Sequence, residues 1–197
     1  MNHLQKQGEF LSFIDIPYTL ESNNEIFLTQ QLLEDWQKRI HQHQYPLFNK
    51  GISNVQSSLF QDCLNSKTST FNPLQLTPLS INFWRLRDSN HNGPAIYFVM
   101  DKPKTLNSNL ILYIGETIAA EKRWKGEHDC KQYIYAYEEA LKKAGLTTQL
   151  SIRFWTDVPK ETKSRRKLER QLIQSWLPPF NKETRGRWAT PFTAQIS

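Results

Sequence analysis

The stretch LYIGETIAAEKRWKGEH, residues 112–128, gathers side chains that can act on an anionic oxygen. It contains Tyr113, Arg123 and His128, and Gly115 follows the tyrosine by two residues. A tyrosine hydroxyl has a pKa near 10 unless neighbouring positive charge lowers it. Arginine stays charged and binds phosphate or carboxylate through paired hydrogen bonds, whereas histidine titrates near neutrality. These groups form one site only if a strand and a helix bring them together.

The pattern around this stretch predicts a strand hairpin followed by a helix. AIYFVM (95–100) and LILYI (110–114) are rich in β-branched and aromatic residues, and a short polar connector joins them. A parallel crossover needs a dozen or more residues, so the two strands are expected to pair antiparallel. Gly115 is expected to close the second strand and turn the chain. A helix should follow, with Thr117 as its N-cap and Gly126 as an interruption.

The remaining elements surround this hairpin. Downstream we expect a helix over 130–145 ending at Gly145, a strand over 150–155, and a helix from about Lys160 to the prolines at 178–179. Upstream, apolar spacing predicts a helix over 29–43, capped by Thr29 and ended by Pro46. Residues 48–78 suggest short helix and loop, and 79–86 a possible strand.

This element order predicts an α+β fold with a small three-stranded antiparallel sheet flanked by helices. We expect a mainly helical N-terminal extension over residues 1–86 and a core domain over 87–197. The two cysteines, Cys63 and Cys130, lack the spacing of a metal site or a disulfide framework. No apolar stretch has the length of a membrane span, and no secretory leader is visible. We therefore expect a cytoplasmic protein with no membrane partner.

The charge is distributed unevenly along the chain. Residues 1–100 contain 7 Lys and Arg against 8 Asp and Glu, whereas residues 101–197 contain 18 against 11. A strongly positive half favours a polyanion such as nucleic acid, because cationic side chains release counterions from phosphates. A basic surface that serves only solubility remains the alternative.

The hairpin and the elements after it resemble the GIY-YIG nucleases. AIYFV and LYIG are similar to the paired signature that names the family, with Ala95 in place of its first glycine. Arg123 in EKRWK matches the family's helix arginine. KLERQLIQSWLPPFN resembles its last helix, with Glu169 at the metal-binding position and Asn181 at the trailing asparagine. The resemblance covers about residues 93–183, and residues 1–86 match no pattern that we can name.

The resemblance implies a metal-dependent endonuclease that hydrolyses phosphodiester bonds in DNA. One carboxylate suits one Mg²⁺ or Mn²⁺ ion that keeps most of its waters. The first tyrosine would be the general base, provided that its pKa is lowered or a partner accepts its proton, and the second would assist it. The arginine would neutralise phosphate charge, and the histidine would orient the base or relay its proton. The expected catalytic residues are Tyr97, Tyr113, Arg123, His128, Glu169 and Asn181, with Glu169 as the metal ligand.

Two positions depart from the family pattern. His128 lies five residues after Arg123, where similar proteins have a spacing of four. Glu116 stands three residues after Tyr113, where some members carry a lysine that helps the base. Further basic residues and the glycine suggest where nucleic acid would lie. The expected nucleic-acid contacts are Gly115, Lys122, Lys125, Arg165, Arg166, Arg185 and Arg187.

Each assignment has an ordinary structural alternative. The tyrosines can be sheet aromatics, the basic run at 163–167 a solvated helix face, and Glu169 a partner of neighbouring arginines in surface salt bridges. At the level of function, two alternatives share the same residues. One is a structure-specific, repair or RNA-processing nuclease, and the other is a nucleic-acid-binding module that does not cleave. A single active centre cuts one strand, so a specific double-strand cut would need a homodimer or two sequential events.

Overall fold

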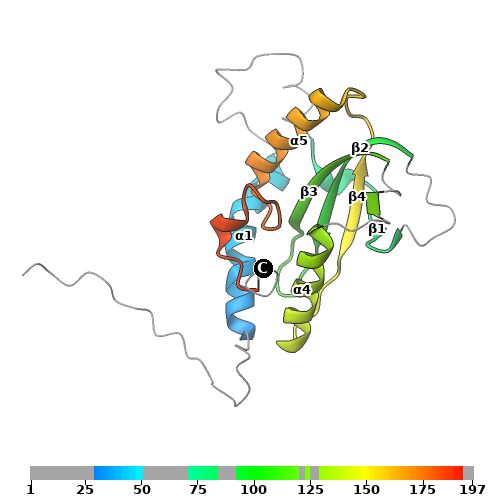
Figure 1. Cartoon of the computed structure of the whole chain (residues 1–197). Helices are drawn as coiled ribbons and strands as arrows, with labels where there is room; N and C mark the ends of the chain where they lie inside the picture. The colour runs from blue at the N-terminus through cyan, green and yellow to red at the C-terminus, as the bar shows by residue number, and fades with distance from the viewer. Residues whose placement is uncertain (1–28, 51–70, 84–91, 120–122, 125–128, 193–197) are drawn as a thin grey trace, which may run out of the picture.

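The computed structural model describes residues 29–50, 71–83, 92–119, 123–124 and 129–192 of the 197-residue chain. In these parts it shows an α+β fold, which confirms the predicted class (Figure 1). The helices are α1 (Gln30–Lys50), α4 (Asp129–Lys143) and α5 (Thr162–Trp176), with short 3-10 turns η1 (Pro73–Gln75) and η3 (Arg185–Trp188). The strands are β1 (Leu79–Ser80), β2 (Asn92–Asp101), β3 (Leu110–Ala119) and β4 (Ser151–Trp155).

The sheet has four strands in the order β1-β4-β2-β3, and every neighbouring pair is antiparallel. The predicted hairpin of β2 and β3 is confirmed, but the prediction of three strands is wrong. The fourth strand is β1, in which Leu79 and Ser80 pair with Ile152 and Ser151 of β4. It covers only the first two residues of the predicted strand, of which 84–86 lie outside the described residues. A strand this short gives little periodicity to detect.

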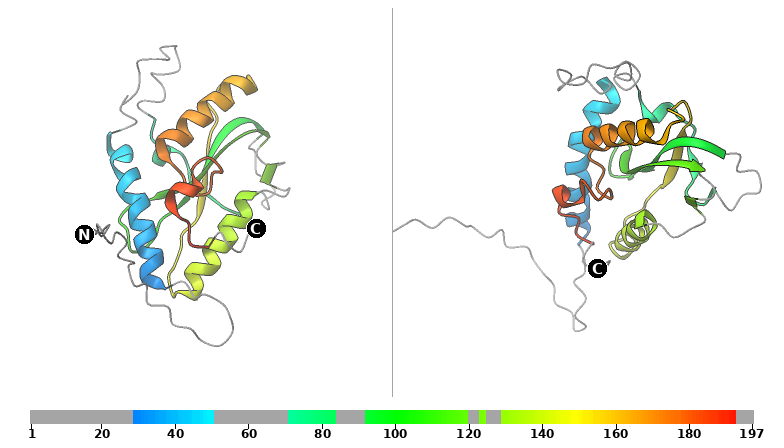
Figure 2. Two further views of the ribbon diagram at one scale, coloured as in Figure 1. Left: turned by 60° about the vertical axis from the view of Figure 1, so that its left-hand side comes forward. Right: turned by 45° about the horizontal axis from the view of Figure 1, so that its top comes forward.

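Side chains of β2 alternate between two hydrophobic clusters, one on each face of the sheet. Tyr97 and Val99 belong to the cluster that α1 and α4 cover, and Phe98 and Met100 belong to the cluster that α5 covers. Figure 2 shows these helices around the sheet. The central strand is therefore buried on both faces, which explains why 95–100 is almost continuously apolar.

Helix α1 is part of this core. Leu33, Trp36 and Ile40 are fully buried, as their helical spacing predicted. The prediction that Pro46 ends the helix is wrong, because α1 continues to Lys50. A proline removes one helical hydrogen bond, yet tertiary packing can outweigh that loss. Here Phe48 packs in the second cluster, with its ring centroid 4.7 Å from that of Trp176.

Residues on both sides of the predicted boundary at 86 and 87 share these clusters. Trp36 of α1 contacts Phe180, with ring centroids 6.3 Å apart, and Phe83 contacts Phe154 of β4 at 5.0 Å. The boundary therefore does not separate two hydrophobic cores among the described residues. None of the helices in the described parts of the chain is long and apolar enough to cross a membrane.

The ends of two elements decide how the hairpin continues. Gly145 follows α4 with φ +71°, which confirms its predicted role as the glycine after a helix. Strand β3 is longer than predicted and runs through Gly115 to Ala119. Thr117 is therefore a strand residue paired with Ala95, and its predicted role as a helix N-cap is wrong. Its Oγ1 instead accepts a hydrogen bond from the backbone of Ala119 at 3.0 Å.

Candidate active site

The two signature tyrosines lie together on one face of the hairpin. Tyr97 of β2 pairs with Gly115 of β3, and Tyr113 pairs with Val99, so the tyrosines are diagonal neighbours. Their ring centroids are 5.9 Å apart with the planes tilted by 26°. A shift in strand register between Val99 and Met100 lets Tyr113 face the same cluster as the preceding Leu112. The irregular pairing thus brings the second tyrosine onto the first.

Gly115 is required because Tyr97 lies directly against it. A Cβ atom at residue 115 would be 2.4 Å from both Cζ and Oη of Tyr97, and 2.9 Å from Cε1 of Tyr113. Such distances are far below van der Waals contact, so any larger residue would displace the tyrosines. The predicted turn at Gly115 is wrong, because the residue is inside a strand. It is also buried beneath the ring, and so it is not available to a nucleic-acid backbone.

Burial determines the protonation of both tyrosines. Tyr97 is 1% exposed, and burial raises its pKa well above 10, with further contributions from Tyr113 and Cys130. Arg123 opposes the shift through its charge and a hydrogen bond with Tyr97. Burial likewise raises the pKa of the half-buried Tyr113, while a hydrogen bond with Tyr97 lowers it. One condition for Tyr97 as the general base, a lowered pKa, is therefore not met. The role stays a prediction that depends on the other condition, a partner that accepts its proton.

Arg123 lies beside this pair at the protein surface. Its side chain is exposed, whereas the neighbouring Trp124 is 1% exposed and meets the Tyr97 ring edge-on at 5.7 Å. Trp124 anchors this helical turn, which explains how an exposed arginine can reach a buried tyrosine. The other predicted site residues of this region, Lys122, Lys125 and His128, lie outside the described residues, and their roles stay predictions.

Glu169 of α5 reaches the same hairpin at the outer edge of β3. Its Oε1 accepts a hydrogen bond from the backbone N–H of Glu116 at 3.0 Å. Partial burial raises the pKa of Glu169 to about 7, and the nearby carboxylates of Glu116 and Glu183 also raise it. The hydrogen bond from Glu116 and the charge of Arg166 lower the pKa. Among the described residues, Oε2 of Glu169 has no hydrogen-bond partner. A half-buried carboxylate with one oxygen available fits a single divalent cation that keeps most of its waters.

No group of three or more His, Cys, Asp or Glu side chains with metal-binding geometry occurs in the described parts of the chain. A cation at Glu169 would therefore need its other ligands from water or from a bound molecule. This arrangement suits Mg²⁺, which dehydrates reluctantly and is often bound through one or two carboxylates.

Glu116 forms ion pairs with two arginines of α5. Its Oε2 accepts a hydrogen bond from Nε of Arg165 at 2.8 Å, and its Oε1 accepts one from Nε of Arg166 at 3.1 Å. In the described structure these arginines pair with Glu116 and not with Glu169. Arg165 is fully buried, so its predicted contact with nucleic acid is wrong. Arg166 keeps 67% of its side chain exposed and remains available to a phosphate.

Asn181 serves the backbone of β3. Its Oδ1 accepts a hydrogen bond from the N–H of Ile114 at 2.9 Å, and its Nδ2 donates one to the carbonyl of Ile114 at 2.8 Å. The side chain is 3% exposed. Both ends of the amide are engaged one residue before Gly115, so Asn181 supports the backbone of β3, and its catalytic role stays a prediction.

Gln44 of α1 makes the same kind of pair with Ile111, at 2.8 Å and 3.0 Å. Between these amides, the N–H of Phe180 donates to the carbonyl of Leu112 at 3.0 Å. The side chains of Gln44, Asn181 and Glu169 thus occupy the outer edge of β3 in place of a further strand.

The last two predicted contacts, Arg185 and Arg187, lie in η3 and are exposed. The guanidinium of Arg185 donates a hydrogen bond to the hydroxyl of Tyr133 and lies 5.7 Å from the centre of that ring. Tyr133 belongs to α4, which packs on the same sheet face as the tyrosine pair. Arg185 is therefore held on the α4 side of the candidate site.

Two residues near the tyrosines were not predicted as part of the site. Cys130, at the start of α4, is fully buried and raises the pKa of both tyrosines. Trp124 anchors the turn that carries Arg123. The bulk of Trp124 next to the arginine was a visible signal for burial, whereas nothing in the sequence placed Cys130 against β2 and β3.

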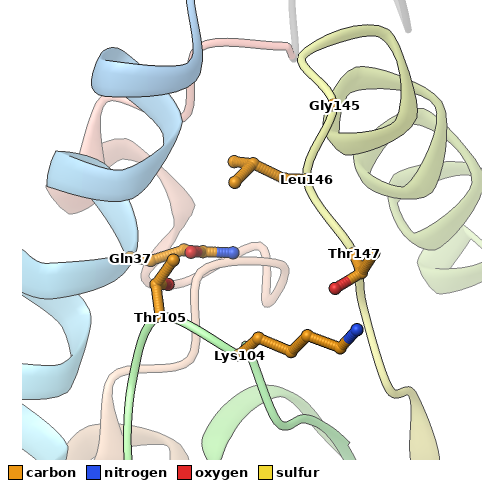
Figure 3. Close-up of a pocket in the computed structure, with 6 residues that line it drawn as sticks. All are labelled: Gln37, Lys104, Thr105, Gly145, Leu146 and Thr147. Carbon is orange, nitrogen blue, oxygen red and sulfur yellow. The ribbon is translucent and has the colours of Figure 1, made fainter.

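A separate cavity lies at the connector end of the hairpin (Figure 3). It has a volume of about 260 Å³, and its walls come from α1, the β2–β3 connector and the segment after α4. The lining residues are Gln37, Lys104, Thr105, Gly145, Leu146 and Thr147. It shares no residue with the tyrosine pair or with Glu169.

The candidate site thus joins the tyrosine pair and Arg123 on one sheet face to Glu169 at the adjoining edge of β3. Comparisons of the chain with protein families, curated proteins and solved structures found no match.

Proposed function

We propose that the protein is a metal-dependent endonuclease that hydrolyses phosphodiester bonds in DNA. The observation that carries the proposal is the close packing of Tyr97 and Tyr113 over Gly115, with Arg123 and Glu169 beside them. Folding alone does not readily explain this combination. A tyrosine ring leaves room only for glycine at residue 115, and an exposed arginine and a carboxylate with an available oxygen lie beside it. The resemblance to the GIY-YIG nucleases and the positive charge of residues 101–197 support the same reading.

The arrangement assigns a distinct task to each residue. Arg123 is exposed and would bind the scissile phosphate through paired hydrogen bonds. Tyr113 keeps part of its surface and would orient the attacking water, whereas the buried Tyr97 would hold the Tyr113 hydroxyl through their hydrogen bond. Burial keeps both phenols protonated in the free protein, so the proton of the attacking water would pass through the tyrosine pair to an acceptor, the role in which His128 stays predicted.

Glu169 would hold one Mg²⁺ or Mn²⁺ through its free oxygen. Such an ion neutralises charge on the phosphate and on the leaving oxygen. Exposed cations on both sides of the site, Arg166 and Arg185, would extend the contact with the nucleic-acid backbone. The proposal includes a cytoplasmic location, and a homodimer if the enzyme makes a specific double-strand cut.

Cleavage of nucleic acid by matched variants tests the proposal. Wild-type, Glu169→Gln and Glu139→Gln proteins would be incubated with supercoiled, linear, branched and single-stranded DNA and with RNA, each with Mg²⁺, Mn²⁺ or EDTA. Glu139 is a partly exposed residue of α4 that pairs with Lys143, so it controls for the loss of a glutamate charge. We expect Glu169→Gln to lose roughly 100-fold or more in rate and Glu139→Gln to match the wild type.

The outcomes separate the alternatives. Cleavage confined to branched DNA or to RNA would replace a general DNA endonuclease with a structure-specific or RNA-processing enzyme. Tight binding without cleavage of any substrate would indicate the non-cleaving module. Equal cleavage by Glu169→Gln and the wild type would remove Glu169 from the active site.

A further inference from the structure

Helix α5 begins with a charge arrangement that its own sequence does not balance. The helix has no acidic residue in its first turn, although Arg165 and Arg166 lie near its N-terminus. Positive charge at this end is unfavourable because the N-terminus of a helix carries a partial positive charge. The residue before the helix, Glu161, makes no side-chain cap to the helix backbone. The anion that pairs with both arginines comes from another element.

That anion is the side chain of Glu116 on β3. Both of its oxygens accept hydrogen bonds from arginine Nε atoms of α5, and its side chain is only 14% exposed. Arg165 uses its remaining nitrogens on the segment that leads into α5. Its Nη1 donates to the carbonyls of Pro159 at 3.1 Å and Lys160 at 2.9 Å, and its Nη2 donates to Oγ1 of Thr162 at 3.3 Å. Every nitrogen of this buried guanidinium is therefore engaged.

The same residue of β3 also fixes Glu169. Arg165 and Glu169 are four residues apart in α5 and share one helix face. Arg165 binds the side chain of Glu116, and Glu169 binds its backbone N–H. Two contacts one helical turn apart thus end on a single strand residue, which sets the height of α5 along β3.

We propose that Arg165 and Glu116 are positioning residues that hold the carboxylate of Glu169 in the geometry for a divalent cation. This inference rests on the proposed metal-dependent function and assigns its supporting contacts. Residues that orient a metal ligand typically change metal affinity by about 10-fold to 100-fold when they are replaced. The pair also gives a role to Glu116, which stands where some members of the resembled family carry a lysine.

The test measures Mn²⁺ binding directly by isothermal titration calorimetry, well below the melting temperature of each variant. Arg165→Lys keeps the charge but loses the three-directional hydrogen bonding of the guanidinium. We expect its Mn²⁺ affinity to fall about tenfold or more, with a matching rise in the Mg²⁺ concentration for half-maximal cleavage. The cleavage rate at saturating Mg²⁺ should stay within about threefold of the wild type. Arg170→Lys, the same substitution at an exposed position of α5, is the matched control.

If Arg165→Lys fails to fold, Glu116→Gln tests the same positioning role. It preserves the backbone N–H that binds Glu169 and one side-chain oxygen, so the same loss of Mn²⁺ affinity is expected. Unchanged Mn²⁺ affinity in a folded Arg165→Lys or Glu116→Gln protein would overturn the inference. Glu169→Gln separates the two proposals: if it binds Mn²⁺ as the wild type does, the metal site itself is wrong.

Discussion

Two acidic side chains lie toward opposite ends of the β2–β3 hairpin, and their surroundings differ. Asp101 is fully buried, and its oxygens accept hydrogen bonds from the hydroxyls of Tyr137 and Thr148 and from the N–H of Gln149, each at 2.7 Å. Glu169 is half-buried and, within the described part of the chain, accepts one hydrogen bond, from the backbone N–H of Glu116. The first carboxylate is fully satisfied by the protein, whereas the second can still accept a cation or a proton.

The tyrosines near these two carboxylates differ in the same way: one hydroxyl is enclosed by protein partners, and the other is partly exposed. Tyr137 donates to Asp101 and accepts a hydrogen bond from Gln37 at 2.7 Å, so its hydroxyl is enclosed by the fold. Tyr113 keeps part of its surface and lies within the electrostatic reach of Glu169 and Arg123. Full satisfaction indicates a structural network, and partial satisfaction indicates a site prepared for a further ligand.

Removal of the Asp101 carboxylate should destabilise the protein more than removal of the Glu169 carboxylate. Asp101→Ala leaves the buried hydroxyl of Tyr137, and the part-buried donors of Thr148 and Gln149, without their acceptor. We expect a loss of about 3 kcal/mol in the free energy of unfolding, against about 1 kcal/mol or less for Glu169→Ala. Urea denaturation followed by circular dichroism measures both. Equal losses for the two variants would contradict the division between a structural and a ligand-binding carboxylate.

A second variant disturbs the tyrosine pair without removing a charged group. Gly115→Ala places a methyl group against Tyr97, and overpacking of this kind costs about 1–3 kcal/mol. Cleavage by the folded variant should fall by about tenfold or more, because the tyrosines must move apart. The same substitution at Gly186, where a Cβ atom has open space, serves as the control and should leave stability and cleavage near those of the wild type. A Gly115→Ala protein of full stability and activity would show that the close approach is not required.

Titration of Glu169 should give a smaller effect, a dependence of the melting temperature on pH. The pKa of Glu169 is about 7 in the folded protein against 4.5 ordinarily, so between these values the folded state holds a proton that the unfolded state has lost. Stability linked to Glu169 therefore falls as pH rises from about 4.5 through 7. Glu169→Gln should melt about as the wild type does at pH 4.5 and a few degrees higher at pH 8. An equal difference in melting temperature at both pH values would rule out this titration.

The sequence predicted the elements that carry strong local patterns. The apolar runs at 95–100 and 110–114 form the hairpin, and periodic residues such as Trp36 and Ile40 lie in the core as α1 requires. The second half of β3 was missed because GETIA contains a glycine and a glutamate, both weak strand formers. Its strand conformation depends on pairing with β2 and on the contacts of Glu169 and Asn181, which are distant in sequence.

The candidate site shows the same limit. Spacing and resemblance selected Tyr97, Tyr113, Arg123 and Glu169, and the structure brings these four together. Spacing cannot reveal burial, so the raised pKa of Tyr97 and the enclosed Arg165 were not foreseen. The partner of Arg165 lies 49 residues away in the chain, and only the folded sheet makes them neighbours.

The amide pairs on β3 have a consequence for how the chain can be divided. Gln44 and Asn181 satisfy backbone groups that would otherwise form an open strand edge. Exposed edges recruit strands from other molecules and promote aggregation. A fragment that begins at residue 87 would lack Gln44 and present the bare edge around Ile111. Such a fragment should self-associate through β3, so the segment before the hairpin protects the sheet against intermolecular pairing.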